Sequence, residues 1–542
     1  MSIFDTIRVR KKKRSNFDLS HEVHLTTEFG RLTPFLCQEV LPGDSWRCSS
    51  QVFVRMAPML APIMSRVNVF THYFFVPNRL LWSQWEDFIT GGEDGTAKPP
   101  MPTINLGDVR GLNMAGKASL IDYFGIPLPG ISDKDSNFDV SLLPFLAYQK
   151  VYNDWYRDEN LIDEIPCKVA SNGSQEVNTE WVKLRHRAYQ KDYFTSALPD
   201  PQKGAEMVLP LQKMRVQYEN SSLGTPVVRS GPDFDPKDGT VIVRDKQADG
   251  TRLYQQTATS GGGFNEFPLN VRPSAYVDPK DSAPTINELR RSVRIQEWLE
   301  ANARAGSRYI EQIFSHFGVK SSDARLQRAE LLGGGRSPIM VSEVVQTSAT
   351  EIDGNAATPQ GNMSGHGVSA QANHSFKRYF EEHGFIIGIM SIMPKASYMQ
   401  GLERMWSRRD KFDYAWPELA NLGEQEILNK ELFAVCRDPQ EKDEMEKVFG
   451  YTPRYAEYKY QANRVCGEFR DTLSYWHLGR KFNNPPKLNK AFIECNPDSA
   501  DESVRENLNR IFAVEFGDHF WCQIFNNCTA KRILPYYGTP ML

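Results

Sequence analysis

The chain has 542 residues, and its 64 Lys and Arg nearly balance its 67 Asp and Glu, which gives a net charge of −3. This balance excludes a generally basic protein that coats nucleic acid and also a generally acidic protein. The mean hydropathy is −0.50 and no run of about eighteen apolar residues occurs, so we predict no transmembrane helix. A chain of this length is too long for one simple core, so we expect several domains or large insertions.

The first twenty residues form a predicted basic arm, and they lack the apolar segment of a secretory signal. We therefore expect the protein to stay in the cytosol where it is made, or to act after cell lysis. Six cations lie within seven residues and leave a net charge of −9 on the rest of the chain: Arg8, Arg10, Lys11, Lys12, Lys13 and Arg14. Such an arm binds phosphates by releasing counterions, and Phe17 could add base stacking. A solvated charge run or a tail that folds on assembly is the alternative.

Strand patterns occupy the segment that follows the arm. Residues 45–56 read as a strand, and residues 67–76 carry apolar side chains on both faces, which is typical of a strand buried on both sides. Pro77 has no N–H and is expected to end this strand. Asn78 is expected to cap a short helix that ends at Gly91 and Gly92. The apolar face of that helix consists of Leu81, Trp85, Phe88 and Ile89.

The middle of the chain mixes loops with a helix and an insertion. Residues 94–135 read as loops, and residues 144–158 have helical spacing. In residues 220–263, turn signals alternate with short apolar runs, and a hairpin is predicted at 240–253. Long loops usually carry function or disorder, so we interpret 220–263 as an exposed insertion. Asp233, Asp235 and Asp238 suggest a calcium loop, but Lys237 occupies a ligand position and no closing Glu follows. A solvated turn is therefore the preferred interpretation.

Helical and then strand patterns complete the chain. Thr285 and Glu288 fit a capping box, and two apolar stripes follow on either side of Gly306. We expect both stripes to pack into a core. They consist of Ile286, Leu289 and Val293, and of Tyr309, Ile310, Ile313, Phe314 and Phe317. Residues 337–346, 384–393 and 519–533 then read as strands, of which 384–393 is expected to be buried.

Early and late strands on either side of a long excursion must pair across a large gap, as in Greek-key sandwiches. The pattern therefore predicts a mainly β chain, either an antiparallel sandwich or a jelly roll, with long loop and helical insertions. We divide the chain into the arm 1–20, a first part of the jelly roll at 21–219, the exposed insertion 220–263, and a helical insertion with the remaining strands at 264–542. Together these parts make one discontinuous jelly-roll domain.

No residue pattern points to catalysis, a metal ion or another cofactor. His21 and His24 fall one residue short of an HExxH zinc motif and would face opposite sides of a strand. The eight cysteines form no CxxC pair, so we expect free, mostly buried thiols. Two alternatives remain at this stage. A β-sandwich carbohydrate-binding protein or hydrolase would need convergent carboxylates or a metal, and a monomeric single-stranded DNA-binding protein would need a long basic groove with aromatics.

Several segments resemble the major capsid proteins of microviruses, the small icosahedral phages with single-stranded DNA, and above all those of the gokushovirus subgroup. The segments that carry the resemblance, in family order, are SNFDLSHEVHLTTEFGRLTPF, LPGDSW, RVNVFTHYFFVPNRLLWSQWEDFITGG, TINELRRSVRIQEWLEANARAGSRYIEQIFSHFGV, DARLQRAELLGGGRSPI, EHGFIIGIMSIMP, YMQGLERMWSRRDKFDYAWPELANLGEQEILNKE and VFGYTPRYAEYKY. The resemblance implies a viral jelly roll, which is an eight-stranded antiparallel sandwich or barrel. It also implies that sixty copies form a T=1 shell around a circular single-stranded DNA genome. It implies a virion protein that assembles in the bacterial cytoplasm and is not an enzyme.

The resemblance also implies partners. In this family a large insertion makes a protrusion at the threefold axes, and 220–263 is our candidate for its exposed part. The charged residues expected to contact the bacterial surface receptor there are Asp233, Asp235, Lys237, Asp238, Arg244 and Lys246. Sixty arms would bring roughly 360 positive charges, too few for a genome with about one charge on each of several thousand nucleotides. We therefore expect a small basic DNA-packaging protein or other cations inside the shell. The resemblance adds an internal scaffolding protein and a minor pilot protein.

Overall fold

The computed structural model describes residues 13–127, 138–204, 286–305, 309–318, 320, 322–347, 362–435, 439–514 and 517–537, and the backbone of short strands at 217–218, 240–247, 250–258, 264–268, 275–276, 350–352 and 355–358. The chain divides into two compact units. The first unit comprises Met1–Lys203 and Leu299–Leu542, and the second comprises Gly204–Trp298. The boundary falls inside helix α7 (Ile286–Ala305).

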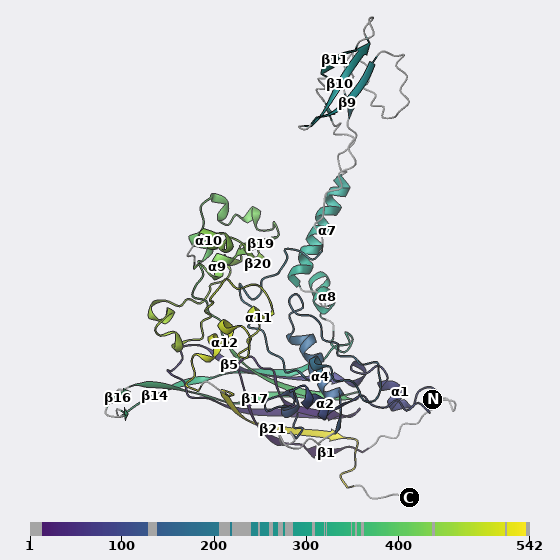
Figure 1. The fold of residues 1–542 in the computed structure, drawn as a ribbon. Coiled ribbons are helices and arrows are strands. Elements are labelled where there is room, and N and C mark those ends of the chain that lie inside the picture. Colours follow the sequence, from purple (N-terminus) through teal and green to yellow (C-terminus); the bar gives the residue numbers. More distant parts are fainter. Residues whose placement is uncertain are drawn as a thin grey trace. The chain divides into compact units, whose positions relative to one another are not determined.

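The first unit contains a six-stranded antiparallel sheet, named sheet A here (Figure 1). Its order is β1-β21-β4-β17-β14, and β2 also pairs with β21. The strands are β1 (Ser15–Asp18), β2 (His21–Thr27), β4 (Ser45–Met56), β14 (Met340–Val345), β17 (Met363–Tyr379) and β21 (Phe520–Arg532). In β4 and β21, buried side chains alternate strictly with exposed or half-buried ones. Sheet A therefore has one face toward a core and one toward solvent.

The second sheet of this unit, sheet B, has four antiparallel strands in the order β13-β5-β18-β3. These strands are β3 (Thr33–Val40), β5 (Val67–Pro77), β13 (Glu330–Pro338) and β18 (Gly384–Pro394). Every residue of β18 is buried, and β5 has only two half-buried residues. Both faces of the sheet are therefore covered.

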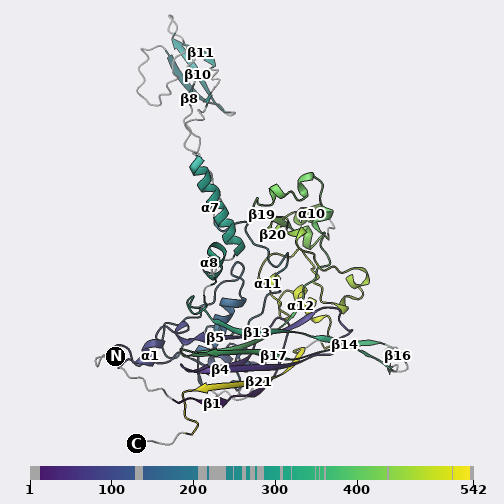
Figure 2. The same ribbon diagram turned by 180° about the vertical axis from the view of Figure 1, so that it is seen from behind.

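The two sheets are stacked as layers, and the chain passes repeatedly between them (Figure 2). The core between them combines side chains of both sheets, including Trp46, Val54 and Ile524 from sheet A and Tyr73 and Ile386 from sheet B. Asn526 is fully buried there: its side-chain amide accepts a hydrogen bond from Ser50 Oγ at 2.6 Å and reaches the Phe35 carbonyl oxygen at 3.5 Å. Hydrophobic burial on this scale is the main force that holds the sandwich together.

The far face of sheet B is covered by short helices and loops with their own apolar core. Helix α4 is central to it, because Phe145, Leu146 and Tyr148 are completely buried and the Tyr148 hydroxyl donates to the Leu32 carbonyl oxygen at 2.8 Å. The covering elements are η1 (Asn78–Leu80), α1 (Trp85–Thr90), β6 (Thr103–Asn105), α2 (Leu106–Gly111), α3 (Leu120–Tyr123), β7 (Asp139–Ser141), α4 (Leu143–Val151), the π-helical turn η2 (Tyr152–Tyr156) and α5 (Thr179–Val182).

A third core is built mainly from the segment between β18 and β21, and Tyr193, Phe194 and Ala197 from the segment after α5 also belong to it. It includes Phe449 and Phe492, whose ring centroids are 5.1 Å apart. Short elements carry it: η4 (Arg404–Trp406), η5 (Lys411–Asp413), η6 (Pro417–Leu419), β19 (Glu424–Leu428), α9 (Asn429–Leu432), α10 (Pro439–Met445), β20 (Val448–Pro453), η7 (Ala456–Tyr458), η8 (Gly467–Arg470), η9 (Ser474–Trp476), α11 (Lys490–Ile493) and α12 (Glu502–Asn509). Helix α8 (Tyr309–Phe317), β15 (Thr350–Ile352) and β16 (Asn355–Thr358) complete the unit.

The second unit contains a three-stranded sheet of order β11-β10-β9 and a short β12-β8 pair. The strands are β8 (Gln217–Tyr218), β9 (Thr240–Gln247), β10 (Gly250–Ala258), β11 (Phe264–Pro268) and β12 (Ala275–Tyr276). The predicted hairpin at 240–253 is confirmed by the antiparallel pairing of β9 with β10.

Two predictions about local structure are wrong. Asn78 does not cap a helix: it begins the single turn η1, and helix α1 begins only at Trp85. The intervening Trp82 forms a bridge with Val169, which interrupts helical hydrogen bonding. The predicted core packing of the two stripes is also wrong where side chains are described, because Ile286, Leu289, Val293, Phe314 and Phe317 are all exposed. Helical spacing shows that one face is apolar and does not show what covers it.

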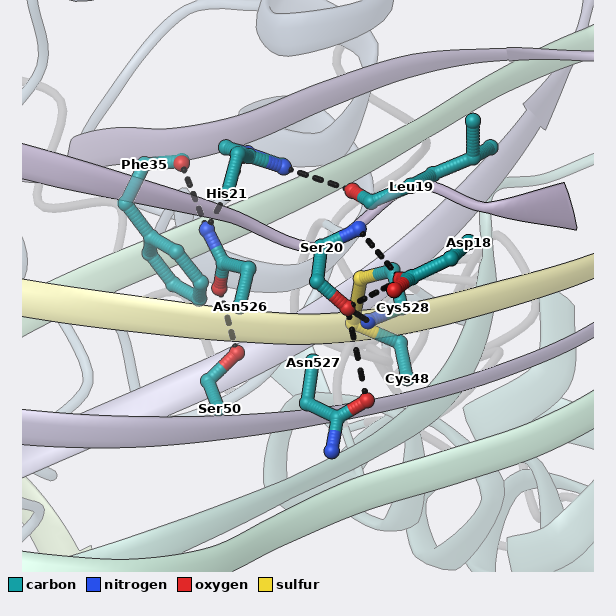
Figure 3. Close-up of a disulfide and its surroundings, with 10 residues drawn as sticks. All are labelled: Asp18, Leu19, Ser20, His21, Phe35, Cys48, Ser50, Asn526, Asn527 and Cys528. Atoms are coloured by element: carbon teal, nitrogen blue, oxygen red, sulfur yellow. Dashed lines mark hydrogen bonds between the residues drawn. A yellow bond between two sulfur atoms is a disulfide. The ribbon is translucent and has the colours of Figure 1, made fainter.

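The expectation that all cysteines are free is wrong for one pair. Cys48 on β4 and Cys528 on β21 stand directly opposite each other with Cα atoms 4.2 Å apart, and they form a disulfide (Figure 3). Cys436 lies outside the described residues. Among those described, five other cysteines are free, of which Cys167, Cys495 and Cys522 are buried and Cys466 is exposed. Burial raises the pKa of the Cys167 and Cys495 thiols to about 12, so they stay protonated and unreactive.

Candidate assembly and nucleic-acid surfaces

The solvent-facing side of sheet A, called the exposed face of sheet A below, is one candidate surface. It follows from the alternation in each strand, since every second residue points away from the core. On β4 this face consists of Arg47, Ser49, Gln51, Phe53 and Arg55. On β21 it consists of Trp521, Gln523, Phe525, Asn527, Thr529 and Lys531. On the neighbouring strands it includes Glu22, His24, Ala370, Ser375 and Lys377. It therefore combines cations, amides and aromatic rings.

The predicted basic arm leads onto this face. Arg8, Arg10, Lys11 and Lys12 lie outside the described residues, whereas Lys13 and Arg14 are exposed. Strand β1 follows directly, and Ser15 pairs with Arg532 at the end of β21. The Arg14 guanidinium carbon lies 5.4 Å from the ring centroid of Tyr379, the last residue of β17. The arm thus departs from one end of the exposed face of sheet A.

The residues predicted to contact a host surface fall in the second unit. Asp233, Asp235, Lys237 and Asp238 lie outside the described residues. Arg244 and Lys246 lie on β9, opposite Leu253 and Thr251 of β10. Because they are two positions apart on one strand, they belong to the same face of the hairpin.

A second candidate surface, the 402–422 surface, was not predicted as a site. Its exposed apolar side chains are Leu402, Met405, Trp406, Phe412, Tyr414, Trp416 and Leu422, with Tyr458 beside them. Trp406 is 68% exposed and Phe412 is 57% exposed. The signal in the sequence was the density of aromatic residues in a segment with no strand or long-helix pattern.

Polar contacts hold the 402–422 surface in one conformation. The Asp413 carboxylate accepts hydrogen bonds from the backbone N–H groups of Arg409 (2.7 Å) and Asp410 (2.8 Å), and these bonds lower its pKa. The Arg408 guanidinium lies over the Tyr458 ring at 4.4 Å and pairs with Glu457 at 3.3 Å. A rigid loop that presents aromatic rings to solvent is arranged in advance for a partner.

A third candidate is the free edge of sheet A. Strand β14 ends the strand order, and with the neighbouring β16 it extends beyond the stacked sheets in both views (Figures 1 and 2). Met340 is 74% exposed, and Val344, Val345 and Met363 are exposed as well. Unpaired apolar edge strands readily join other chains, so natural proteins cover them or charge them.

Ionic contacts of two buried side chains, Arg31 and His519, tie the start of the chain to its end. The Arg31 guanidinium pairs with Asp518 at 2.8 Å and with Asp498 at 3.1 Å. His519 Nδ1 lies 2.6 Å from Glu28 Oε1, and its Nε2 lies 2.9 Å from the Val514 carbonyl oxygen. Burial opposes the charge on His519, but the contacts with Glu28 outweigh it and raise the pKa of the imidazole. These contacts close the sandwich around strands that are almost 500 residues apart.

The described residues offer little that resembles an enzyme site. They contain no cluster of three or more His, Cys, Asp or Glu suited to a metal ion. His21 is half-buried with Nδ1 2.9 Å from the Leu19 carbonyl oxygen, and His24 is exposed, so the two histidines do face opposite sides. Within the same part of the chain, every helix is too short or too polar to cross a membrane.

Comparison with known proteins gives one consistent result. A family described as "Capsid protein (F protein)" matches residues 5–542. Capsid protein VP1 of Chlamydia phage 1 is 34% identical, over 99% of this chain and 97% of that protein. Capsid protein VP1 of Bdellovibrio phage phiMH2K is 36% identical, over 89% of this chain and 88% of that protein. Capsid protein VP1 of Spiroplasma virus 4 is 31% identical, over 98% and 95%.

Proposed function

Because this chain belongs to the capsid protein (F protein) family, we propose that sixty copies of it close into a T=1 icosahedral shell around a circular single-stranded DNA genome. The chain is a structural major capsid protein of the virion and not an enzyme. The resemblance to gokushovirus-type microvirus proteins, drawn from separated sequence segments, is confirmed by similarity over almost the full length.

The proposal includes an eight-stranded jelly roll as the structural frame of each subunit. Its support is the strand order. Sheet A contains the series β2-β21-β4-β17, and sheet B contains the series β3-β18-β5-β13. The early strands β2, β3, β4 and β5 therefore alternate between the two sheets. They pair with the late strands β21, β18, β17 and β13, respectively. Early strands therefore pair with late ones throughout, which is the Greek-key relation expected of this fold. Strand β1 precedes these eight strands, and the remaining strands and helices are insertions between them.

The observation that carries shell assembly is the aromatic 402–422 surface. Monomeric soluble proteins rarely expose contiguous apolar patches larger than a few hundred Å². Here Trp406 and Phe412 stand in solvent although hydrogen bonds fix the loop around them. In a protein that assembles with itself, neighbouring copies cover such a surface, and closed symmetry then limits growth. The edge strand β14 is the second contact that we assign to a neighbouring copy.

The finer partners are also proposals. The basic arm, Arg8 to Arg14, contacts the genome inside the shell, and a small basic packaging protein supplies the charge that the arms lack. An internal scaffolding protein and a minor pilot protein act during assembly in the host cytoplasm. The insertion 220–263 meets a bacterial surface receptor. Its support is the separation of Gly204–Trp298 as a compact unit, which a projecting module requires.

Electron microscopy of the expressed full-length chain tests this proposal. We expect closed particles of one diameter that protect DNA from nuclease. Deleting residues 8–14 should leave the particles intact and lower their DNA content. A protein that remains monomeric at every concentration and salt condition would exclude the proposed function, and normal DNA content after the deletion would exclude the role of the arm.

A further inference from the structure

The central strands of sheet A have an unusual composition. Strands β4, β17 and β21 have 12, 17 and 13 residues, and none of them contains Asp or Glu, although the chain has 67 of these residues. The carboxylates of sheet A lie on its outer strands, with Asp18 on β1, Glu22 on β2 and Glu343 on β14. On these three strands, β4, β17 and β21, the exposed face of sheet A therefore carries cations and no carboxylate, in a protein whose net charge is negative. The nearest carboxylate on this face is Glu22 of β2, which lies opposite Phe525.

The cations of this face are close together and unpaired. Arg47 on β4 lies directly opposite Lys377 on β17, and Thr529 on its other side is followed two residues later by Lys531. Like charges in directly opposed positions destabilise a sheet. Arg47, Lys377 and Lys531 form no ion pair with any residue that the structure describes. Bound anions would remove this repulsion, and phosphates are anions that arginine and lysine bind well.

The other part of the same face offers aromatic and amide groups. A shallow hollow of about 560 Å³ is lined by Glu22, Gln51, Val52, Phe53, Ala370, Gln523 and Phe525. The Arg55 guanidinium lies 5.3 Å from the Phe53 ring centroid, and Trp521, which is opposite Arg55, is 48% exposed. Aromatic rings beside arginine are the platform on which proteins stack bases of single strands. Gln51 and Gln523 add amides that can hydrogen-bond to base edges.

We propose that the exposed face of sheet A binds single-stranded DNA, with phosphates at Arg47, Lys377 and Lys531 and bases at the hollow beside Phe53 and Phe525. Along β4 the two groups are six residues apart, a distance of about 20 Å that one extended strand of nucleotides spans. The basic arm begins at the cationic end of this face, so arm and sheet form one continuous binding surface. This inference rests on the proposed function and assigns this face to the interior of the shell.

The test measures binding of a thymidine oligonucleotide and of inorganic polyphosphate to the full-length chain at several salt concentrations. We expect Arg47→Gln/Lys377→Gln to weaken both ligands about tenfold and to reduce the salt slope for the oligonucleotide by about 1.4, since each lost phosphate contact removes about 0.7. Phe53→Leu/Phe525→Leu should weaken only the oligonucleotide, by about fivefold or more, with an unchanged salt slope. All these side chains point to solvent, and thermal melting checks that each variant is folded.

The matched control is Arg505→Gln/Lys487→Gln, which removes two exposed cations from the segment between β18 and β21, outside every surface assigned above. It should leave both ligands unaffected. If it weakens binding as much as Arg47→Gln/Lys377→Gln, or if the phenylalanine variant binds the oligonucleotide like the wild type, the inference is wrong. Particle formation by the same preparations distinguishes a failure of this inference from a failure of the proposed function. Particles with unchanged DNA binding in all variants overturn this inference alone, whereas a wild-type chain that forms no particles overturns the proposed function.

Discussion

Arg31 is the residue whose loss should destabilise the subunit most directly by an electrostatic route. Its side chain is 9% exposed and contacts Asp518, which is 16% exposed, and Asp498, which is 61% exposed. Burial opposes the charge on Arg31, but Tyr123, Asp518 and Asp498 outweigh it and raise the pKa of the guanidinium. The guanidinium thereby ties the turn after β2 to the segments on either side of α12 and to the start of β21.

Replacement by methionine keeps most of the volume and removes the charge. Breaking a buried ion pair costs about 3–5 kcal/mol, because the partner is left buried and unpaired. The pair with exposed Asp498 contributes under about 1 kcal/mol, and Asp518 keeps a hydrogen bond from Thr26 Oγ1 at 2.5 Å. We therefore expect Arg31→Met to lower the free energy of unfolding by about 3 kcal/mol. Arg31→Lys, which cannot reach both carboxylates, should cost about 1 kcal/mol.

The assay is urea unfolding of the unassembled protein at pH 7, followed by tryptophan fluorescence. The matched control is Arg464→Met, because Arg464 is 65% exposed and 3.9 Å from Glu403. It should change the free energy by no more than about 0.5 kcal/mol. A double-mutant cycle with Asp518→Asn should give a coupling of about 2 kcal/mol. A loss at Arg31 no larger than the loss at Arg464 would refute the reasoning.

Three further predictions concern pH, redox state and assembly. Burial and the nearby Arg31 lower the pKa of His186 to about 4, so the stability that this neutral imidazole contributes is present above about pH 6.5 and is lost as the pH falls toward 4. Between pH 7 and pH 4.5, the free energy of urea unfolding should therefore fall by about 2 kcal/mol more for the wild type than for His186→Gln. Equal losses would contradict this prediction. Mass spectrometry of unreduced, oxidised protein should find a peptide that links Cys48 to Cys528 and disappears on reduction, whereas linkage of either cysteine to another would contradict the pairing. Trp406→Ser should prevent particle formation. Trp521→Ser also removes an exposed tryptophan, but it should leave particle formation intact. Assembly of both variants would rule out the 402–422 surface as a contact.

The sequence predicted individual strands well because their patterns are local. Residues 45–56 became β4 with the predicted limits, and β5 ends at Pro77 as expected. The apolar run at 384–393 is β18, which is buried at every position. In each case, whether one or both faces of the strand are buried determines the order of apolar and polar residues along it, so the sequence alone shows the pattern.

The surfaces could not be predicted in the same way, because they depend on which strands become neighbours. Arg47 and Lys377 are 330 positions apart in the chain, and their opposition follows only from the pairing of β4 with β17. The same holds for Cys48 and Cys528, which are 480 positions apart. Helix α7 shows a different limit of sequence analysis. The spacing of its apolar residues predicted the helix correctly, but the expected burial of those residues was wrong.

The mass of the assembled particle tests the central claim most directly. Sixty chains of 61.9 kDa give a protein shell of about 3.7 MDa, to which packaged DNA adds further mass. Native mass measurement of nuclease-treated particles should therefore find one species at or above this value, and the protein mass should stay at about 3.7 MDa after the DNA is released. A set of open aggregates with no fixed mass, or a species no larger than a few chains, would contradict the account.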